Sequence, residues 1–173
     1  MNKAIFLDRD GTINVEKNYL YQKEKFEFIE GVPQTLREFR KKGYLLILVT
    51  NQSGIARGYY SVSDMKKLHE YMQKELMKYN ACFDDIFYCP HHPKGIIKEY
   101  QKDCDCRKPK VGMFKSAVQK YNIDVHSSYA IGDRERDLIP AEQLEIKCIL
   151  ISEILNDRWI TGKNLAEIAK FIK

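Results

Sequence analysis

The sequence predicts an α/β fold in which helices cover both faces of a parallel sheet. Short apolar runs alternate along the chain with amphipathic stretches of helical periodicity, which is typical of parallel strands joined by helices. The run at 44–49 is apolar throughout, as expected of a strand that is buried on both faces. Polar residues follow three of the runs directly, and parallel strands end at the same edge of their sheet. We therefore predict a Rossmann-like sheet with a ligand site at its carboxyl edge.

Strands and helices are expected in alternation. The strands are expected at 3–7, 44–49, 86–88, 129–131 and 148–151. The helices are expected at 33–42, 64–79, 113–121, 138–144 and 165–172. Gly43 suits the end of the first helix, and Ser61 offers an N-cap for the second. The segment between the third strand and the third helix lacks periodicity and is long for a loop, which indicates function or disorder.

Length and composition are those of one compact globular domain over 1–173. The chain is 44% hydrophobic and 31% charged, and its net charge of +5 is spread along the sequence, which favours an anionic ligand only weakly. The first apolar run is too short for a signal peptide, and no stretch approaches a membrane span. We expect a cytoplasmic monomer without a membrane partner. The spacing of the polar segments leaves no room for a bulky cap domain.

The strongest chemical signal is the segment DRDGT at 8–12, directly after the first expected strand. Side chains two apart on an extended backbone face the same side, so Asp8 and Asp10 can both reach a substrate. Their carboxylates repel each other, and Mg²⁺ bound by both would keep Asp8 ionised. Asp8 could then attack phosphorus, while Asp10 protonates the leaving oxygen and later activates water. A capping turn or a calcium loop is the alternative, but Thr12 and Tyr19 do not suit a calcium loop.

Three further segments supply groups that suit phosphate and metal. The second strand ends in a hydroxyl and amides that can cradle phosphate oxygens, from Thr50, Asn51, Gln52 and Ser53. Lys108, in the basic segment 107–110, offers fixed positive charge against the charge that phosphoryl transfer spreads over oxygens. Asp133 follows the fourth strand and would be a further Mg²⁺ ligand. Asp137 could orient the ligands or cap the helix that follows.

The long loop carries a predicted zinc site. The chain has five cysteines and no export signal, which favours metal binding over disulfides for any that cluster. Two close pairs of ligands separated by twelve residues suit tetrahedral Zn²⁺, and they are Cys89, His91, Cys104 and Cys106. His92 is the alternative to His91. Such a closed site would be structural and would tie down a loop at about 89–110, next to the two cations Arg107 and Lys108.

In this order, the four polar segments resemble the signature motifs of the haloacid dehalogenase-like (HAD-like) phosphatase superfamily, over roughly 3–151. The resemblance implies a HAD-like fold and a phosphoric monoester hydrolase that needs Mg²⁺. It implies that Asp8 is the nucleophile and Asp10 the general acid and base. It further implies that Thr50 and Lys108 stabilise the phosphate and that Asp133 binds Mg²⁺.

The zinc loop and the segment at 50–58 narrow the resemblance. Within the superfamily they are similar to heptose bisphosphate phosphatases and, less closely, to histidinol-phosphate phosphatases. The heptose group implies hydrolysis of the C7 phosphate of D-glycero-D-manno-heptose 1,7-bisphosphate, a step toward activated heptose for a surface polysaccharide. In that group the segment after the first motif helps to hold the sugar, which implies Glu16, Lys17, Asn18 and Tyr19. The resemblance also implies Arg107 in substrate recognition, and the cation for the remote phosphate would be Arg107, Arg57 or Arg134.

Three rival functions remain at this point. Histidinol-phosphate phosphatase is the nearest, and a phosphate-release assay would separate it from the heptose enzyme. A catalytically dead, zinc-stapled interaction module is disfavoured because a binding module needs neither Asp8 nor Asp10. A phosphatase for nucleic-acid ends fits the net charge of +5, but no strip of basic and aromatic residues suits a single strand, so we expect no nucleic-acid partner.

Overall fold

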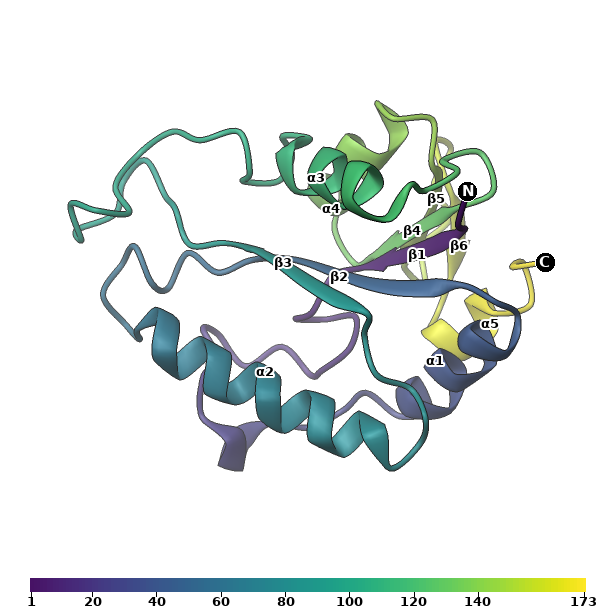
Figure 1. Ribbon diagram of the computed structural model, residues 1–173, viewed down its shortest axis with the longest axis horizontal. Coiled ribbons are helices and arrows are strands. Elements are labelled where there is room, and N and C mark those ends of the chain that lie inside the picture. Colours follow the sequence, from purple (N-terminus) through teal and green to yellow (C-terminus); the bar gives the residue numbers. More distant parts are fainter.

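Six parallel strands form the centre of the molecule (Figure 1). The computed structural model describes residues 1–173, and the strands follow the order β3-β2-β1-β4-β5-β6 across the sheet. They are β1 Ala4–Leu7, β2 Leu45–Asn51, β3 Asp85–Cys89, β4 Tyr129–Gly132, β5 Lys147–Ile151 and β6 Ile160–Gly162. The predicted parallel sheet is confirmed. The sixth strand was not predicted.

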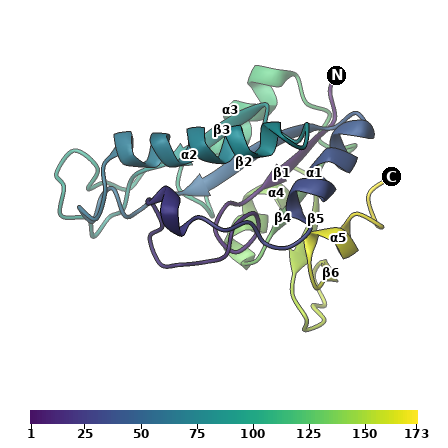
Figure 2. The same cartoon turned by 90° about the horizontal axis from the view of Figure 1, so that it is seen from below.

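Helices cover both faces of the sheet, as predicted (Figures 1 and 2). They are α1 Val32–Lys41, α2 Val62–Met77, α3 Gly112–Tyr121, α4 Glu135–Glu142 and α5 Leu165–Ile168, with a short 3-10 helix, η1, at Lys23–Lys25. α1, α2 and α5 pack on one face, and α3 and α4 pack on the other. α2 begins with a capping box between Ser61 and Asp64, which explains its sharp start.

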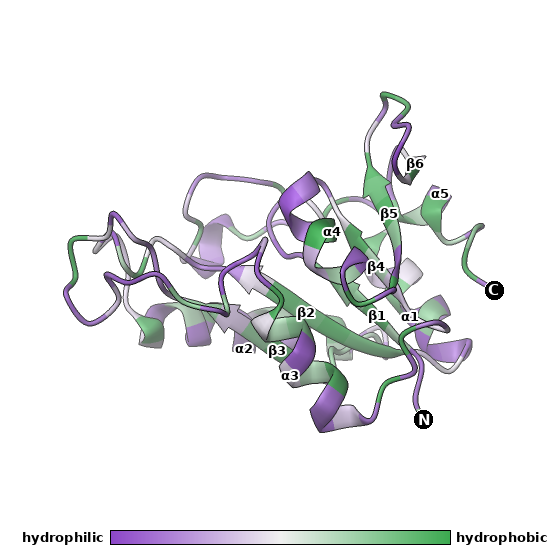
Figure 3. Cartoon of the chain, turned by 90° about the horizontal axis from the view of Figure 1, so that it is seen from above, coloured by the Kyte–Doolittle hydropathy of each residue, from purple (hydrophilic) through white to green (hydrophobic).

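Each face of the sheet has its own apolar core because successive strand residues point to opposite sides. In β1, Ile5 and Leu7 pack in the core beneath α1, whereas Ala4 and Phe6 pack in the core beneath α3. The Phe6 ring stacks on the ring of Phe114, with centroids 4.9 Å apart. Figure 3 shows the strands as hydrophobic and most of the loops beyond their carboxyl ends as hydrophilic. The apolar cores therefore end where the polar loops begin.

The chain reverses its direction of travel across the sheet at β1. This strand pairs with β2 on one side and with β4 on the other, and Leu7 lies opposite both Leu48 and Ile131. The residues that follow these strands therefore emerge side by side at the carboxyl edge. Such a switch point is where open α/β sheets bind their ligands.

Two predicted helix boundaries were wrong in instructive ways, and one strand was missed. α4 starts three residues earlier than expected, because the Asp137 side chain accepts the backbone N–H of Arg134 at 3.2 Å and caps the helix from within. α5 ends at Ile168, because the chain beyond it closes in tighter turns. β6 escaped prediction because it is only three residues long and exposes Ile160. No helix is both long enough and apolar enough to cross a membrane.

Candidate active site

A polar pocket of about 330 Å³ opens at the carboxyl edge of the sheet. Its walls come from the loops after β1, β2 and β4 and from the loop between β3 and α3. Eleven predicted site residues line it: Asp8, Asp10, Glu16, Asn18, Tyr19, Asn51, Gln52, Ser53, Arg57, Arg107 and Arg134. Segments that are distant in sequence thus meet in one place, as the parallel sheet predicts.

A buried ion-pair cluster forms the floor of the pocket. Lys108 is only 2% exposed, and its ammonium group lies 2.8 Å from Asp8 Oδ1, 2.7 Å from the carbonyl oxygen of Val49 and 2.8 Å from Asp137 Oδ1. An ammonium group has three N–H donors, so three acceptors hold it in one position. The amide of Asn51 bonds both the backbone N–H and the carbonyl of Lys108, each at 3.0 Å. Lys108 is therefore fixed from two sides.

Asp8 and Asp133 are placed where a cation would be favourable. Burial raises the pKa of Asp8 to about 7, with a further contribution from Asp137, while Lys108 opposes the shift. Burial and Asp137 also raise the pKa of Asp133. Asp133 Oδ1 is buried without a hydrogen-bond partner. Carboxylate oxygens of Asp8, Asp133 and Asp137 lie within 4.8 Å of one another, which is the hard-oxygen setting that Mg²⁺ prefers.

Gly11 makes this cluster possible. Its φ of 84° lies in the left-handed region, and a Cβ at this position would lie 2.4 Å from Asp133 Oδ2. Any side chain would therefore push Asp133 out of the cluster. The glycine in the DRDGT segment is thus required both for the turn after β1 and for the approach of the loop after β4.

The carboxylate of Asp10 lies outside the three-carboxylate cluster. Its Oδ1 accepts from Arg9 Nη2 at 2.9 Å and from Asn14 Nδ2 at 3.0 Å. Its Oδ2 lies 3.4 Å from Gln52 Nε2, which also donates to the Thr50 hydroxyl at 2.9 Å. Asp10 is therefore held beside Thr50, on the open side of the pocket. This placement suits proton transfer, and its predicted contact with Mg²⁺ stays a prediction.

Cationic side chains line another wall of the pocket. They are Arg57, Arg107, Arg134 and Arg136, and among them lies His92, whose pKa burial and the nearby arginines lower. Burial lowers the pKa of Arg107, and the neighbouring Arg136 and Arg57 lower it further, which places these charges close together. Arg134 differs from the others because its guanidinium lies 3.6 Å from Glu16 and 3.7 Å from Asp133. Arg57, Arg107 and Arg136 are therefore the arginines of the pocket without a carboxylate partner.

The two histidines of the long loop have different surroundings. His91 Nδ1 lies 3.3 Å from Cys106 Sγ and 3.7 Å from Cys89 Sγ, and it belongs to the cysteine cluster. His92 faces the pocket instead, where its Nε2 lies 3.1 Å from Arg57 Nη2. The structure thus brings together the predicted set with His91 rather than the alternative with His92.

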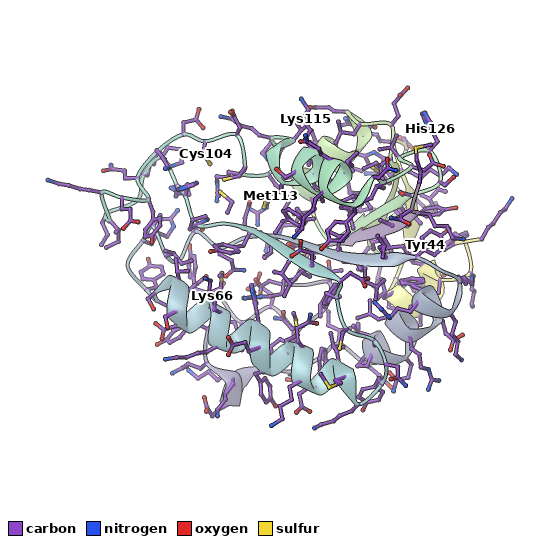
Figure 4. The ribbon with its side chains drawn as sticks, in the orientation of Figure 1. Tyr44, Lys66, Cys104, Met113, Lys115 and His126 are labelled. Atoms are coloured by element: carbon purple, nitrogen blue, oxygen red, sulfur yellow. The ribbon has the colours of Figure 1, made fainter.

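The cysteine cluster has the geometry of a closed metal site. Its sulfur atoms lie 3.0 to 3.5 Å apart, and none forms a disulfide. Four ligands at about 2.3 Å around one Zn²⁺ would place sulfurs about 3.8 Å apart, so a small expansion would accommodate the ion. Figure 4 places Cys104 on this loop, and Met113 on the α3 segment beyond it. No helix or strand interrupts the chain between β3 and α3.

Some predicted residues lie outside the pocket lining, and some lining residues were not predicted. Lys17 pairs with Glu27 at 2.9 Å, Thr50 and Lys108 are buried beneath the pocket surface, and Asp133 is half-buried beside it. Sequence reasoning left Tyr60 and Arg136 out of the site and considered Asp137 only as a residue that could orient the ligands or cap a helix. The charges after β4 were a usable signal for Arg136 and Asp137. Nothing local marks Tyr60, whose hydroxyl donates to Gln52 Oε1 at 2.6 Å.

The parallel sheet, the buried Asp8–Lys108–Asp137 cluster and Asp10 beside it define a HAD-like phosphatase. A family model described as polynucleotide kinase 3 phosphatase matches residues 3–138. The crystal structure of a D,D-heptose 1,7-bisphosphate phosphatase from B. bronchiseptica, complexed with magnesium and phosphate, superposes with a TM-score of 0.85 at 28% identity. The match covers 98% of this chain and 97% of that one.

Curated relatives are closer in sequence. A D-glycero-beta-D-manno-heptose-1,7-bisphosphate 7-phosphatase from Haemophilus ducreyi is 52% identical over 146 residues, which cover 84% of this chain and 80% of that protein. A protein of the same name from Pasteurella multocida is 44% identical over 170 residues, which cover 98% and 88%. The chain therefore belongs to the polynucleotide kinase 3 phosphatase family. By its curated relatives it belongs to the D-glycero-β-D-manno-heptose-1,7-bisphosphate 7-phosphatases. It is a phosphoric monoester hydrolase.

Proposed function

We propose that this enzyme hydrolyses the C7 phosphate of D-glycero-β-D-manno-heptose 1,7-bisphosphate through an aspartyl phosphate on Asp8. The observation that carries the proposal is the pair of aspartates at the carboxyl edge. Asp8 is buried with Lys108 2.8 Å from its carboxylate, and Asp10 is partly exposed to the pocket. Relatives that are 44% to 52% identical bear the name of this activity, which supports the choice of sugar. The product would be a heptose monophosphate for the synthesis of nucleotide-activated heptose.

The first half-reaction transfers the phosphoryl group to the enzyme. An oxygen of ionised Asp8 attacks phosphorus, the bond from phosphorus to the ester oxygen breaks, and its electron pair leaves with the sugar. Protonated Asp10 gives its proton to that oxygen, so the sugar leaves as an alcohol. Lys108 lies 2.8 Å from Asp8, and Gln52 holds the Thr50 hydroxyl beside Asp10; both groups stabilise the charge on the transferred group.

The second half-reaction returns the enzyme to its starting state. Asp10, now ionised, takes a proton from water, and the water oxygen attacks phosphorus. The bond between phosphorus and Asp8 breaks, which releases inorganic phosphate and the Asp8 carboxylate. Asp8, Asp133 and Asp137 would hold Mg²⁺, which supplies positive charge that keeps Asp8 ionised and offsets charge on the phosphoryl oxygens.

We propose a structural role for zinc. Cys89, His91, Cys104 and Cys106 fill all four positions of a tetrahedral ion, which leaves none for substrate. The cluster ends two residues before Lys108. Bound zinc would therefore fix the backbone that presents Arg107 and Lys108 to the pocket.

The remote phosphate of the bisphosphate requires cations of its own. Arg107 and Arg57 line the pocket, and neither has a carboxylate partner within 4 Å. The planar guanidinium suits bidentate contact with phosphate. A charge-assisted contact of about 1.5–3 kcal/mol corresponds to roughly ten- to a hundredfold in kcat/KM. We propose that these two arginines select a bisphosphate over a monophosphate.

The experiment that tests the function compares substrates by phosphate release. We expect kcat/KM to be highest for the β anomer of the heptose bisphosphate, and lower for the α anomer, histidinol phosphate and an oligonucleotide with a 3′-phosphate. Arg107→Ala should lower kcat/KM for the heptose bisphosphate but hardly change it for histidinol phosphate. Arg37→Ala, on the exposed face of α1, is the matched control.

The outcomes separate the rivals. A preference for histidinol phosphate or for the oligonucleotide would refute the heptose assignment. An equal loss on both small substrates in Arg107→Ala would mean that Arg107 serves the reacting phosphate instead. We further propose that the enzyme works in the cytoplasm, because the zinc site needs reduced thiols, and that it is a monomer. Size-exclusion chromatography with light scattering tests the monomer.

A further inference from the structure

Arg9 is the most buried charge of the site, and its surroundings are unusual. Its side chain is 1% exposed, and Asp10 is its ion-pair partner. Arg9 Nη2 also donates to the carbonyl oxygen of Leu20 at 2.9 Å, and Nη1 lies 3.1 Å from Nε2 of His69. His69 is a buried residue of α2, 60 positions away in sequence. The Arg9 guanidinium therefore links Asp10, the acid and base of the proposed reaction, to His69 on α2.

The contact with Arg9 fixes the proton on His69. A guanidinium can donate hydrogen bonds but cannot accept them, so His69 Nε2 must be the acceptor. The imidazole is then neutral and carries its proton on Nδ1. Burial and the adjacent Arg9 lower the pKa of His69 to about 3, in agreement with this geometry. A cationic His69 would face Arg9 as a like charge.

We propose that His69 is a positioning residue, whose neutral imidazole fixes Arg9 and thereby aims Asp10 at the reacting oxygen. Arg9 Nη2 lies 2.9 Å from both carboxylate oxygens of Asp10, and Asn14 also donates to Oδ1, so that Oδ2 faces Gln52 beside Thr50. Without His69, Nη1 of Arg9 would lose its acceptor in a buried setting, and the guanidinium would turn to find another. Asp10 would turn with it. The inference rests on the proposed function only in taking Asp10 as the acid and base.

The role predicts a change in one step of the reaction. Asp10 must take a proton from water when the aspartyl phosphate is hydrolysed, whereas p-nitrophenolate leaves without needing a proton. A misaimed Asp10 should therefore slow the second half-reaction on p-nitrophenyl phosphate more than the first. The phosphorylated enzyme would accumulate, and p-nitrophenolate would be released in a burst.

His69→Leu and His69→Gln form the decisive pair of variants. Leucine has no acceptor, while the glutamine carbonyl oxygen reaches about as far as Nε2. We expect His69→Leu to lower kcat about tenfold to a hundredfold, with a burst and a KM that falls with kcat because the phosphorylated enzyme accumulates. His69→Gln should restore kcat to within about threefold and abolish the burst. If the leucine variant is insoluble, His69→Asn, with its shorter side chain, replaces it.

Controls separate positioning from stability. Met72→Ala opens a cavity beneath the same helix and leaves Arg9 and His69 in place. It should lower Tm, leave kcat unchanged and show no burst. An equal loss of kcat in the leucine and glutamine variants, or a burst in Met72→Ala, would overturn the proposal. So would a nitrogen-15 spectrum of the wild type at pH 7 that shows the His69 proton on Nε2. p-Nitrophenyl phosphate contains no sugar, so the test stands even if the heptose assignment fails. Asp10→Asn tests separately whether Asp10 is the acid and base.

Discussion

The three-carboxylate cluster and the cysteine cluster are linked by the short segment from Cys106 to Lys108 but are built in opposite ways. Asp8 and Asp133 follow β1 and β4, Asp137 lies in the first turn of α4, and Lys108 already neutralises part of their charge. Cys89 ends β3, and the other three ligands of the cysteine cluster lie on a loop without helix or strand. The first cluster should therefore keep its shape without a cation, whereas the second should depend on one. A cation serves chemistry in one place and folding in the other.

Asp8→Asn should give the largest effect on activity. An amide cannot attack phosphorus, so kcat should fall by about 10³-fold or more. The fold should be retained because the sheet positions residue 8 regardless of its charge. Steady-state phosphate release and circular dichroism are the measurements. Turnover close to that of the wild type would end the proposed mechanism.

Removal of Mg²⁺ should abolish turnover without unfolding the protein. Exchange into metal-free buffer under conditions that retain zinc should stop phosphate release, and added Mg²⁺ should restore it, because the cation offsets charge in the transition state. Metal analysis and thermal unfolding are measured on the same samples. Full activity without Mg²⁺, or a large loss of Tm, would contradict the contrast between the two clusters.

Cys104→Ser should have a smaller effect on rate but a larger one on stability. We expect the zinc content to drop from about one per chain. Tm should fall and KM should rise, since Arg107 is no longer held. Hydrogen exchange should quicken in the loop between β3 and α3 and stay slow in the sheet. Cys82→Ser, a residue outside the cluster, is the matched control. Unchanged zinc content in Cys104→Ser would show that the site lies elsewhere.

The stability of the protein should depend on pH because the Asp8 carboxylate is buried. Burial raises its pKa in the folded state, so its contribution to stability is present below the unfolded pKa of 3.8 and is lost as pH rises toward about 7. In urea unfolding without divalent cations, Asp8→Asn should thus gain stability relative to the wild type between pH 4 and pH 8. A constant difference across this range would mean that Asp8 titrates normally.

The sequence predicted the parts of the fold that repeat a local pattern. Four strands of the sheet lie within apolar runs of the sequence, and the polar residues that follow three of these runs meet at the carboxyl edge of the sheet. β6 was missed because its only support is pairing with β5, which no local pattern records. α4 began early for a similar reason, since its cap comes from Asp137 inside the helix.

Site residues were predictable when their chemistry stood out and hidden when their partners were distant. Asp8, Asp10 and the cysteine pairs could be named because few residue types suit such chemistry at that spacing. Tyr60 and His69 could not be, since a tyrosine in a loop and a histidine on an amphipathic helix are usually unremarkable. Only the tertiary contacts with Gln52 and Arg9 give them a place in the site.

The position of β1 at the centre of the sheet has a consequence for how the protein is made. Asp8 is synthesised early, but its partner Lys108 comes 100 residues later, and the hydroxyl of Ser128 that anchors Ala4 comes 124 residues later. Contacts across such long separations close slowly in folding, after local helices have formed. A nascent chain must therefore keep Asp8 hydrated until β4 has emerged. The first residue of the site to leave the ribosome is among the last to reach its native surroundings.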